Sequence, residues 1–371
     1  MFRMKRRECM RALAGAAGLS FPGTFASAGA MVSRSDSPAT GGTLTDVPGI
    51  RVGHFTDKRR PTGCTVILFD NEAAVGVDYD GSAPGSSLGV LLQPVSPVNT
   101  IHAILLTGGG VLALPAVAGV TRYLQERKVG FNWGLPEFPI PIVVGSVIAD
   151  NEVGDPKIMP DAEAAYKACE DASTRPVEEG NVGVGAGATI GKMLKEYKGM
   201  KAGLGSASLR LGEVVIGALV VINAVGDIVD WRTGKIVAGA RRPEGKGFAN
   251  IVETLKKLPT NKLQSSLWLN DPVLRSTTLV VVATNADFSK TALTKIAMMA
   301  AVGAGRTISP YHTTGDGDST FAISTNKVKS GLDISVIGAL AAELVSEAVV
   351  RAAKAAKSVE GWVAYRDYNA G

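Results

Sequence analysis

Apolar and polar residues follow two patterns along the chain. Short β-branched and apolar runs, bounded by Gly, Pro, Asn or Asp, predict strands, whereas an apolar residue at every third or fourth position predicts a helix. The first pattern predicts strands at residues 50–56, 64–69, 73–80, 102–107, 141–150, 206–211, 214–230, 276–286 and 320–325. The second predicts helices at residues 111–128, 161–172, 248–258, 288–302 and 333–356.

The order of these elements indicates the fold class. Strands come in runs, and helices lie between the runs, which favours a layered α+β sandwich over a strictly alternating parallel sheet. Asp287 or Ser289 is a suitable amino-terminal cap for the fourth helix, and Asp333 for the last one. No linker divides residues 43–371, so we predict one domain there, preceded by a flexible tail at residues 29–42.

Charge is concentrated at the start of the chain. The formal net charge is +5, and residues 1–28 carry +4 of it, so the remainder is close to neutral. A nearly neutral body does not indicate binding to nucleic acid. The apolar content of 46% and the charged content of 20% are typical of a well-buried globular core.

Residues 1–28 have the order of an export signal. A basic stretch containing Arg6 and Arg7 precedes a mildly apolar run, and Ala-Ser-Ala ends at Ala28. The paired arginines indicate the twin-arginine route, and we expect cleavage after Ala28 and a periplasmic or secreted protein. No later run reaches the roughly 18 apolar residues of a membrane span, so we expect no membrane partner in the mature form.

The common catalytic motifs are missing. His54, His102 and His312 are isolated, so no H-E-x-x-H zinc helix exists, and each histidine is expected to be structural. Cys64 and Cys169 lie in apolar patterns and are expected to be buried thiols, although an oxidising compartment would allow them to pair. No metal and no organic cofactor is predicted.

A glycine-rich loop and an acidic pair are candidates for chemistry. GVGAGATIGKM, residues 183–193, does not fit a phosphate loop, because the glycine spacing is wrong and Met193 replaces the hydroxyl residue. The loop delivers Lys192, which is either a surface lysine or a site residue. Asp316 and Asp318 in HTTGDGDSTFA lie two apart, on one face if the segment is extended. They form either a solvated acidic turn or an oriented carboxylate pair, and they lack the further ligands of a calcium loop.

The strand at residues 276–286 opens with two threonines. Threonine is common in strands, which is the ordinary explanation. A threonine hydroxyl needs a base to act as a nucleophile. Cleavage between Ser276 and Thr277 would give Thr277 a free α-amino group, whose pKa of about 7.7–8.0 suits a base next to its own hydroxyl.

Several motifs occur in one order over residues 43–371: TDVPGIRVGHFTD, TGCTVILF, GSAPGSS, IHAILLTGGG, GNVGVGAGATIGK, LGSASLRLG, VINAVGDIVD, STTLVVVATNA and HTTGDGDSTFA. Together they resemble the L-aminopeptidase/D-esterase (DmpA-like) family, which includes β-peptidyl aminopeptidases and the nylon-oligomer endohydrolase. The resemblance implies a four-layer αββα sandwich similar to amino-terminal-nucleophile hydrolases. It also implies self-cleavage into residues 29–276 and 277–371, and a homo-oligomer of the cleaved units.

The resemblance also implies roles for individual residues. Thr277 corresponds to the nucleophile, Asn223 to the oxyanion-stabilising asparagine, Lys192 to the loop lysine, and Asp316 and Asp318 to the paired acids. Ala149 and Leu112 stand where the family pattern has aromatic residues, so the substrate does not carry over from the family.

The sequence favours a self-processed hydrolase of amide bonds that acts on small peptides or related amides and esters. Two alternatives stay open at this point. An acyltransferase of the same fold would pass the acyl group to an amine instead of to water. An uncut binding protein would keep the fold without processing, because Ser276 differs from the usual Asn or Gly.

Overall fold

The computed structural model describes residues 41–244, 247–267 and 276–368. The expected export signal, residues 1–28, and most of the expected tail, residues 29–42, lie outside these ranges. One sheet dominates the described part, with strand order β3-β5-β4-β2-β14-β12-β9-β8 and β1 also paired with β2. Its strands are β1 (Ile50–Thr56), β2 (Gly63–Asp78), β3 (Ser86–Ser87), β4 (Thr100–Thr107), β5 (Val143–Val147), β8 (Leu204–Leu211), β9 (Val214–Asn223), β12 (Thr277–Ala286) and β14 (Ser319–Val328).

Strand β2 joins the two layers of this sheet. Residues 63–69 pair with β1 and residues 74–78 pair with β14, while β4 pairs with residues 64–68 and 73–74. The two halves meet at residues 70–72, whose side chains are exposed. The sequence predicted two strands here, and this prediction was wrong because the polar residues at the junction interrupt the apolar pattern without ending the strand.

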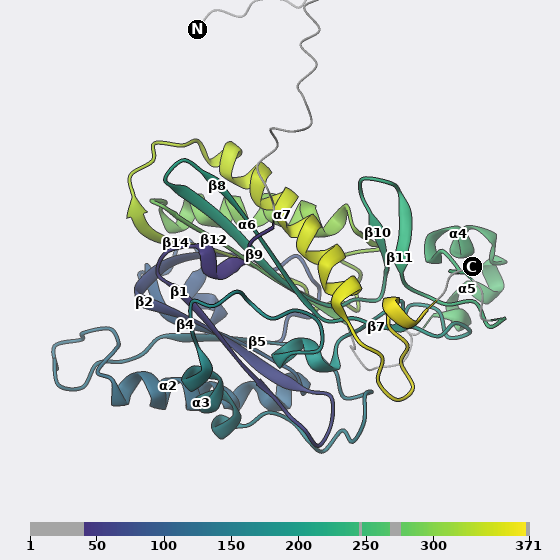
Figure 1. The fold of residues 1–371 in the computed structure, drawn as a ribbon, viewed down its shortest axis with the longest axis horizontal. Helices are drawn as coiled ribbons and strands as arrows, with labels where there is room; N and C mark the ends of the chain where they lie inside the picture. Colours follow the sequence, from purple (N-terminus) through teal and green to yellow (C-terminus); the bar gives the residue numbers. More distant parts are fainter. Residues whose placement is uncertain (1–40, 245–246, 268–275, 369–371) are drawn as a thin grey trace, which may run out of the picture. The chain divides into compact units, whose positions relative to one another are not determined.

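Three apolar cores separate four layers. One core lies between the β layers and includes Leu279, Val281 and residues of β2, β4 and β9. A second lies under α6 (Lys290–Gly305) and α7 (Ile334–Ala355), and includes Val280 and Val282. A third lies under α2 (Val117–Glu126) and α3 (Ala162–Asp171). Figure 1 shows these helix pairs on opposite sides of the strands. The predicted α+β sandwich with an αββα order is confirmed.

Strand β12, which begins with Thr277 and Thr278, illustrates why the layers form. Side chains of a strand alternate between its two faces, so Leu279 and Val281 enter the central core while Val280 and Val282 enter the core under the helices. All ten residues of β12 are buried. At about 1.5–3 kcal/mol for each large apolar side chain removed from water, this strand contributes strongly to stability.

Local signals place the helix ends. The Ser289 side chain accepts a hydrogen bond from Ala292 N, and the Asp333 side chain accepts one from Ser335 N, so both predicted caps are present and Ser289 is the correct alternative of the first pair. The predicted helix at residues 111–128 instead begins as the 3₁₀ helix η4 (Gly110–Ala116). Pro115 accounts for this, because its ring lacks an N–H group and disfavours a continuous α-helix.

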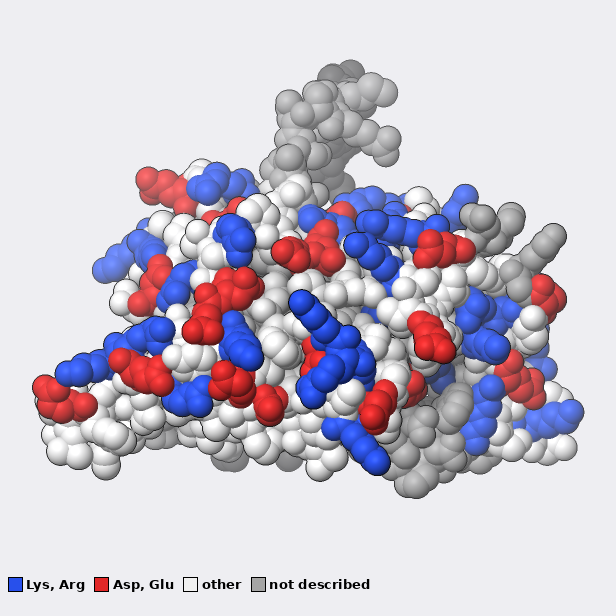
Figure 2. Space-filling model, turned by 60° about the horizontal axis from the view of Figure 1, so that its bottom comes forward, with Lys and Arg blue, Asp and Glu red and all other residues white. Residues whose placement is uncertain are grey.

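Smaller elements complete the described part. The remaining helices and 3₁₀ turns are η2 (Leu44–Asp46), η3 (Gly89–Leu92), η5 (Gly183–Gly187), α4 (Ile251–Lys257), α5 (Thr260–Ser266) and η7 (Tyr365–Asp367). The remaining strands are β6 (Thr189–Ile190), β7 (Met200–Lys201), β10 (Asp227–Asp230), β11 (Lys235–Ala238) and β13 (Ile308–Ser309). On the face seen in Figure 2, basic and acidic side chains are interspersed rather than gathered by sign.

Candidate active site

Thr277 is the first residue of β12 and lies directly opposite Asn223, the last residue of β9. The Thr277 residue is 6% exposed, and its hydroxyl donates a hydrogen bond of 2.6 Å to the carbonyl oxygen of Ser276. The hydroxyl therefore lies against the peptide bond that self-cleavage would break. Segment 268–275, which precedes Ser276, is outside the described residues.

The Ser276 carbonyl has a second donor. The backbone N–H of Gly317 donates to the same oxygen at 2.9 Å, and Ser276 and Asp316 form a parallel β-bridge. A Cβ atom at Gly317 would lie 2.5 Å from Ala83 O and 2.9 Å from Thr277 Oγ1. Only glycine lets the backbone approach this closely, so the residue between the two aspartates holds and polarises the carbonyl.

Asn223 is fully buried, and its hydrogen bonds fix the orientation of its amide. Its Oδ1 accepts bonds of 3.0 Å from both Thr189 N and Lys192 Nζ. Its Nδ2 donates to Ala149 O at 3.1 Å. Because the oxygen has donors on its side and the nitrogen has an acceptor on its side, the amide points its N–H groups away from Lys192.

Lys192 is buried, so the surface alternative for this lysine is excluded. The residue is 8% exposed, and its Nζ lies 3.0 Å from Asn223 Oδ1 and 3.2 Å from Glu152 Oε1. The backbone N–H of Lys192 donates to Val225 O, which ties the glycine-rich loop to the end of β9. Glu152 also accepts a hydrogen bond of 2.7 Å from Thr189 Oγ1. The glycine-rich loop thus supplies the cation Lys192, and the segment that contains Glu152 supplies its counter-charge.

Asp316 and Asp318 are each 1% exposed, so the solvated-turn alternative is excluded. The Asp316 Oδ2 atom accepts bonds from the backbone N–H and the hydroxyl of Thr313. Burial, followed by the negative charge of Asp318, raises the pKa of Asp316 to about 6. Asp318 Oδ1 accepts a bond from Thr278 N at 2.5 Å. Asp316 therefore holds Thr313 within the same turn, and Asp318 holds the backbone of Thr278, the residue after Thr277.

The sequence interpretation treated all three histidines as structural, and the contacts of His312 differ from those of the other two. His54 bonds Thr65, and burial lowers its pKa to about 4, while His102 accepts a bond from Ile142 N. These two contacts fit a structural role. His312, by contrast, places Nδ1 3.1 Å from Asp318 Oδ2. The signal for it was its position six residues before Asp318, in a segment without regular structure.

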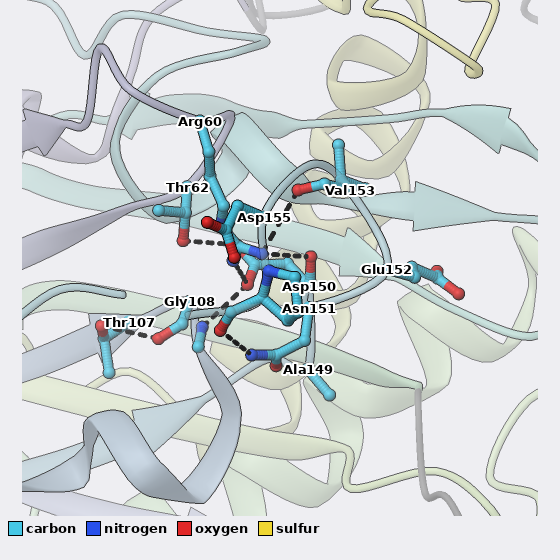
Figure 3. A network of polar contacts seen from close by, with 12 residues as sticks. Arg60, Thr62, Thr107, Gly108, Ala149, Asp150, Asn151, Glu152, Val153 and Asp155 are labelled. Carbon is cyan, nitrogen blue, oxygen red and sulfur yellow. Dashed lines mark hydrogen bonds and ion pairs between the residues drawn. The ribbon is translucent and has the colours of Figure 1, made fainter. Parts of the chain in front are cut away.

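A buried ion pair supports the segment that carries Ala149 and Glu152 (Figure 3). The Arg60 guanidinium bonds the Asp150 carboxylate, and neither side chain is exposed. Asp150 also accepts bonds from Thr62 Oγ1 at 2.7 Å and Gly109 N at 2.8 Å, while Arg60 donates to Val153 O at 3.2 Å. Because Asp150 lies between Ala149 and Glu152, this network fixes both partners of the site at once.

Metal ligation and membrane spanning find no support among the described residues. Within 41–244, 247–267 and 276–368, no three His, Cys, Asp or Glu side chains are arranged to hold a metal ion. None of the helices in these ranges combines the length and the apolar character that crossing a membrane requires. Cys64 and Cys169 are both buried and unpaired, as the sequence predicted.

Known proteins resemble this chain over most of its length. The model of peptidase family S58 matches residues 42–365. An uncharacterized aminopeptidase of Mycobacterium leprae is 35% identical over 87% of this chain and 93% of its own length. A 6-aminohexanoate-oligomer endohydrolase of Kocuria sp. is 31% identical over 83% of this chain and 85% of its own length.

Solved structures share the fold at lower identity. The L-aminopeptidase D-Ala-esterase/amidase of Ochrobactrum anthropi, described as a variant of the Ntn hydrolase fold, superposes with a TM-score of 0.60 at 20% identity, covering 86% of this chain and 88% of the other. A Burkholderia sp. beta-aminopeptidase superposes with a TM-score of 0.59 at 23% identity, covering 87% and 89%. At these identities the match concerns the fold.

Proposed function

Because this chain belongs to peptidase family S58 and is a hydrolase of amide bonds, we propose that Thr277 is its nucleophile and becomes a chain end by self-cleavage. One observation carries the proposal. The Thr277 hydroxyl and the Gly317 N–H both bond the carbonyl oxygen of Ser276, which places the attacking atom and an oxyanion donor at one peptide bond.

Self-cleavage would proceed through an ester. Thr277 Oγ1 attacks the Ser276 carbonyl carbon, the C–N bond between the two residues breaks, and the nitrogen takes up the hydroxyl proton. The Ser276 acyl group is then held on Thr277 Oγ1, and water releases it as a carboxylate. The products are a new carboxyl terminus at Ser276 and a Thr277 with both a free amine and a free hydroxyl.

Turnover would use that amine as general base. With a reference pKa of about 7.7–8.0, it is substantially neutral near pH 8 and lies on the same residue as the hydroxyl that it deprotonates. The hydroxyl attacks the substrate carbonyl, and the Asn223 amide, opposite Thr277 in the strand pair, stabilises the oxyanion. The leaving amine takes the proton, and water hydrolyses the acyl-enzyme.

The charged residues would position these groups. Lys192 holds Asn223 through Oδ1 and contributes a positive charge near the new amine. Asp318 holds the backbone of Thr278, and Asp316 orders the turn that presents Gly317. No step requires a metal or an organic cofactor, because the chain supplies the nucleophile, the base and the oxyanion donors.

Small peptides and related amides are the proposed substrates. The relatives above are named as an aminopeptidase and an oligomer endohydrolase, and both names refer to the hydrolysis of amide bonds. Initial rates of amine release from L-, D- and β-aminoacyl amides and from 6-aminohexanoate oligomers would test this class. Hydrolysis of none of them by a correctly processed protein would contradict it.

Export and assembly are also part of the proposal. Arg6, Arg7 and the run up to Ala28 support twin-arginine export to the periplasm or beyond. Exposed apolar side chains in one segment support a homo-oligomer of cleaved units: Phe131, Trp133, Leu135, Phe138 and Ile140. Cell fractionation and light scattering of the purified protein test these two points.

Replacing Asn223 tests the oxyanion role. We expect Asn223→Ala to lower kcat by about 10²–10³-fold, the usual loss when one oxyanion donor is removed. Asn285→Ala is a matched control, because Asn285 is a buried asparagine of β12 that bonds Val215 N and Glu213 O. Steady-state kinetics on the processed fraction measures both variants. Equal losses of kcat in the two variants would assign Asn223 a structural role instead.

A further inference from the structure

His312 lies between two carboxylates, one at each ring nitrogen. Its Nδ1 is 3.1 Å from Asp318 Oδ2, and its Nε2 is 3.7 Å from Asp80 Oδ2. The ring also lies against Tyr311, with the two ring centroids 3.8 Å apart. The Nδ1 contact is a hydrogen bond, whereas the Nε2 contact is an ion pair without a direct hydrogen bond. Two carboxylates beside one ring favour the positively charged imidazolium form over the neutral form.

The backbone brings the two carboxylates together. Thr320 of β14 is paired with Asp78 of β2, and the pairing continues beyond the strands because Gly81 N donates to Asp318 O. Two residues before Thr320 and two residues after Asp78, the same antiparallel register places Asp318 opposite Asp80. His312 has a φ of +54° and turns its ring toward this position. Such a left-handed residue is uncommon outside glycine and occurs often at functional sites.

The groups facing His312 are mostly acids, and burial, followed by a hydrogen bond with Asp80, raises the pKa of one of them, Asp78, to about 7. Asp318 comes from the turn before β14, while Asp78 and Asp80 come from the end of β2. Lys295 of α6 faces Asp78, and the Tyr311 hydroxyl is buried near the same carboxylates. Burial lowers the pKa of His312, but its bond to Asp318 and the charges of Asp318, Asp80 and Asp78 raise it more, to above its ordinary value.

Asp318 connects His312 with the nucleophile. One of its carboxylate oxygens faces His312, and the other accepts the Thr278 N–H. The Asp318 side chain is fully buried, so its negative charge needs a cation in contact with it. If His312 loses its proton, the negative charge of Asp318 stays beside Asp316 without the neighbouring positive charge of His312. The turn that holds Ser276 and Thr278 is then weakened.

We propose that His312, as an imidazolium held between Asp80 and Asp318, is a positioning residue that keeps the turn at residues 316–318 against Thr277 and sets the alkaline limit of activity. The inference rests on the proposed function in one respect, namely that Thr277 is the nucleophile. His312 touches neither the substrate nor the reacting atoms, and it acts through Asp318.

The linkage has a definite sign. Because the pKa of His312 is raised in the folded state, the stability that its proton contributes is complete below the unfolded-state pKa of about 6.5. That contribution is lost as the pH rises through the folded-state value. Activity that depends on the same proton decreases over the same range.

His312→Asn tests the proposal through kinetics. Asparagine tolerates a positive φ and keeps an N–H donor, but it does not titrate. On the processed enzyme we expect kcat at pH 7 to fall about 10- to 100-fold with little change in KM, as for a displaced orienting group. We also expect the alkaline limb of the kcat profile to disappear. An unchanged kcat together with an unchanged limb would overturn the proposal.

Asp80→Asn supplies a graded test. It removes one charge that raises the pKa of His312, so the alkaline limb should move to lower pH while processing continues. Asp70→Asn is the matched control, because Asp70 is an exposed carboxylate of β2 that pairs with the partly exposed Arg51. The control should leave the limb where it is. Equal shifts in both variants would attribute the limb to general electrostatics and contradict the proposal.

Nuclear magnetic resonance separates this proposal from the function. His312 can be titrated in the Thr277→Ala chain, where no turnover is required, and its signal is assigned by its loss in His312→Asn. We expect a midpoint above about 6.5 and a lower one after Asp80→Asn. A midpoint at or below about 6.5 that does not change after Asp80→Asn would overturn the proposal for His312, even if Thr277 proves to be the nucleophile. A raised midpoint in the Thr277→Ala chain, together with no catalytic activity in the unsubstituted protein, would instead count against the proposed function alone.

Discussion

Thr277→Ala is expected to leave a single uncut chain and to lower kcat/KM by about 10⁴-fold or more. The substitution removes the oxygen that would attack both the Ser276 carbonyl and the substrate carbonyl, and loss of a nucleophile has an effect of this size. Of the two donors that the described residues supply to the Ser276 oxygen, the Gly317 N–H would then remain, and one donor does not break a peptide bond. Denaturing gels and initial rates measure the two losses.

Two substitutions serve as controls for this result. Thr277→Ser keeps a hydroxyl, so it should still be processed, at a reduced rate. Thr278→Val keeps the branched shape of the next residue and should leave the cut before Thr277. If Thr278→Val abolished cleavage and Thr277→Ala did not, the nucleophile would move by one residue.

Asp150→Ala is expected to lower the free energy of unfolding by about 3–5 kcal/mol. It leaves the fully buried Arg60 guanidinium without its counter-charge, and it also removes the acceptor for Thr62 and Gly109. The unfolding should be followed in denaturant in the uncut Thr277→Ala background, because a cleaved two-piece protein does not unfold in a simple two-state manner.

An exposed ion pair supplies the comparison for Asp150. Glu163 bonds Arg122 at 2.9 Å, with side chains 55% and 50% exposed, so Glu163→Ala should cost no more than about 1 kcal/mol. A similar small cost for Asp150→Ala would show that the Arg60–Asp150 network does not anchor the segment of Ala149 and Glu152. The site would then depend on the glycine-rich loop alone.

The layers of the fold could be predicted because they depend on local patterns. Leu279–Val282 is apolar on both faces, which identifies a strand between two cores, and Ser289 and Asp333 mark helix starts. The continuity of β2 and the presence of short helices could not be predicted. The exposed residues 70–72 within β2 look like a turn, and α5 (Thr260–Ser266) has too few apolar residues to show a period.

The candidate site, like the fold, could be predicted from the sequence only in part. The residues expected to act together do lie together in part: Asn223 faces Thr277, Lys192 bonds Asn223, and the turn of the two aspartates bonds the backbone around Thr277. Their catalytic roles remain predictions until they are measured.

The supporting residues were missed because their partners are distant in sequence. Arg60 meets Asp150 across 90 residues, and Asp80 meets His312 across the ends of two strands. Glu152 meets Lys192 near Asn223 at the end of β9, which bonds both Lys192 and Ala149. No local pattern records such pairs, since each depends on how the layers bring strand ends together.

Intact-mass measurement and amino-terminal sequencing of the purified, active protein test the central claim most directly. The expected result is two pieces, with the smaller one beginning at Thr277 and containing 95 residues. A chain that is continuous through Ser276 and Thr277 and still turns over substrate would contradict it.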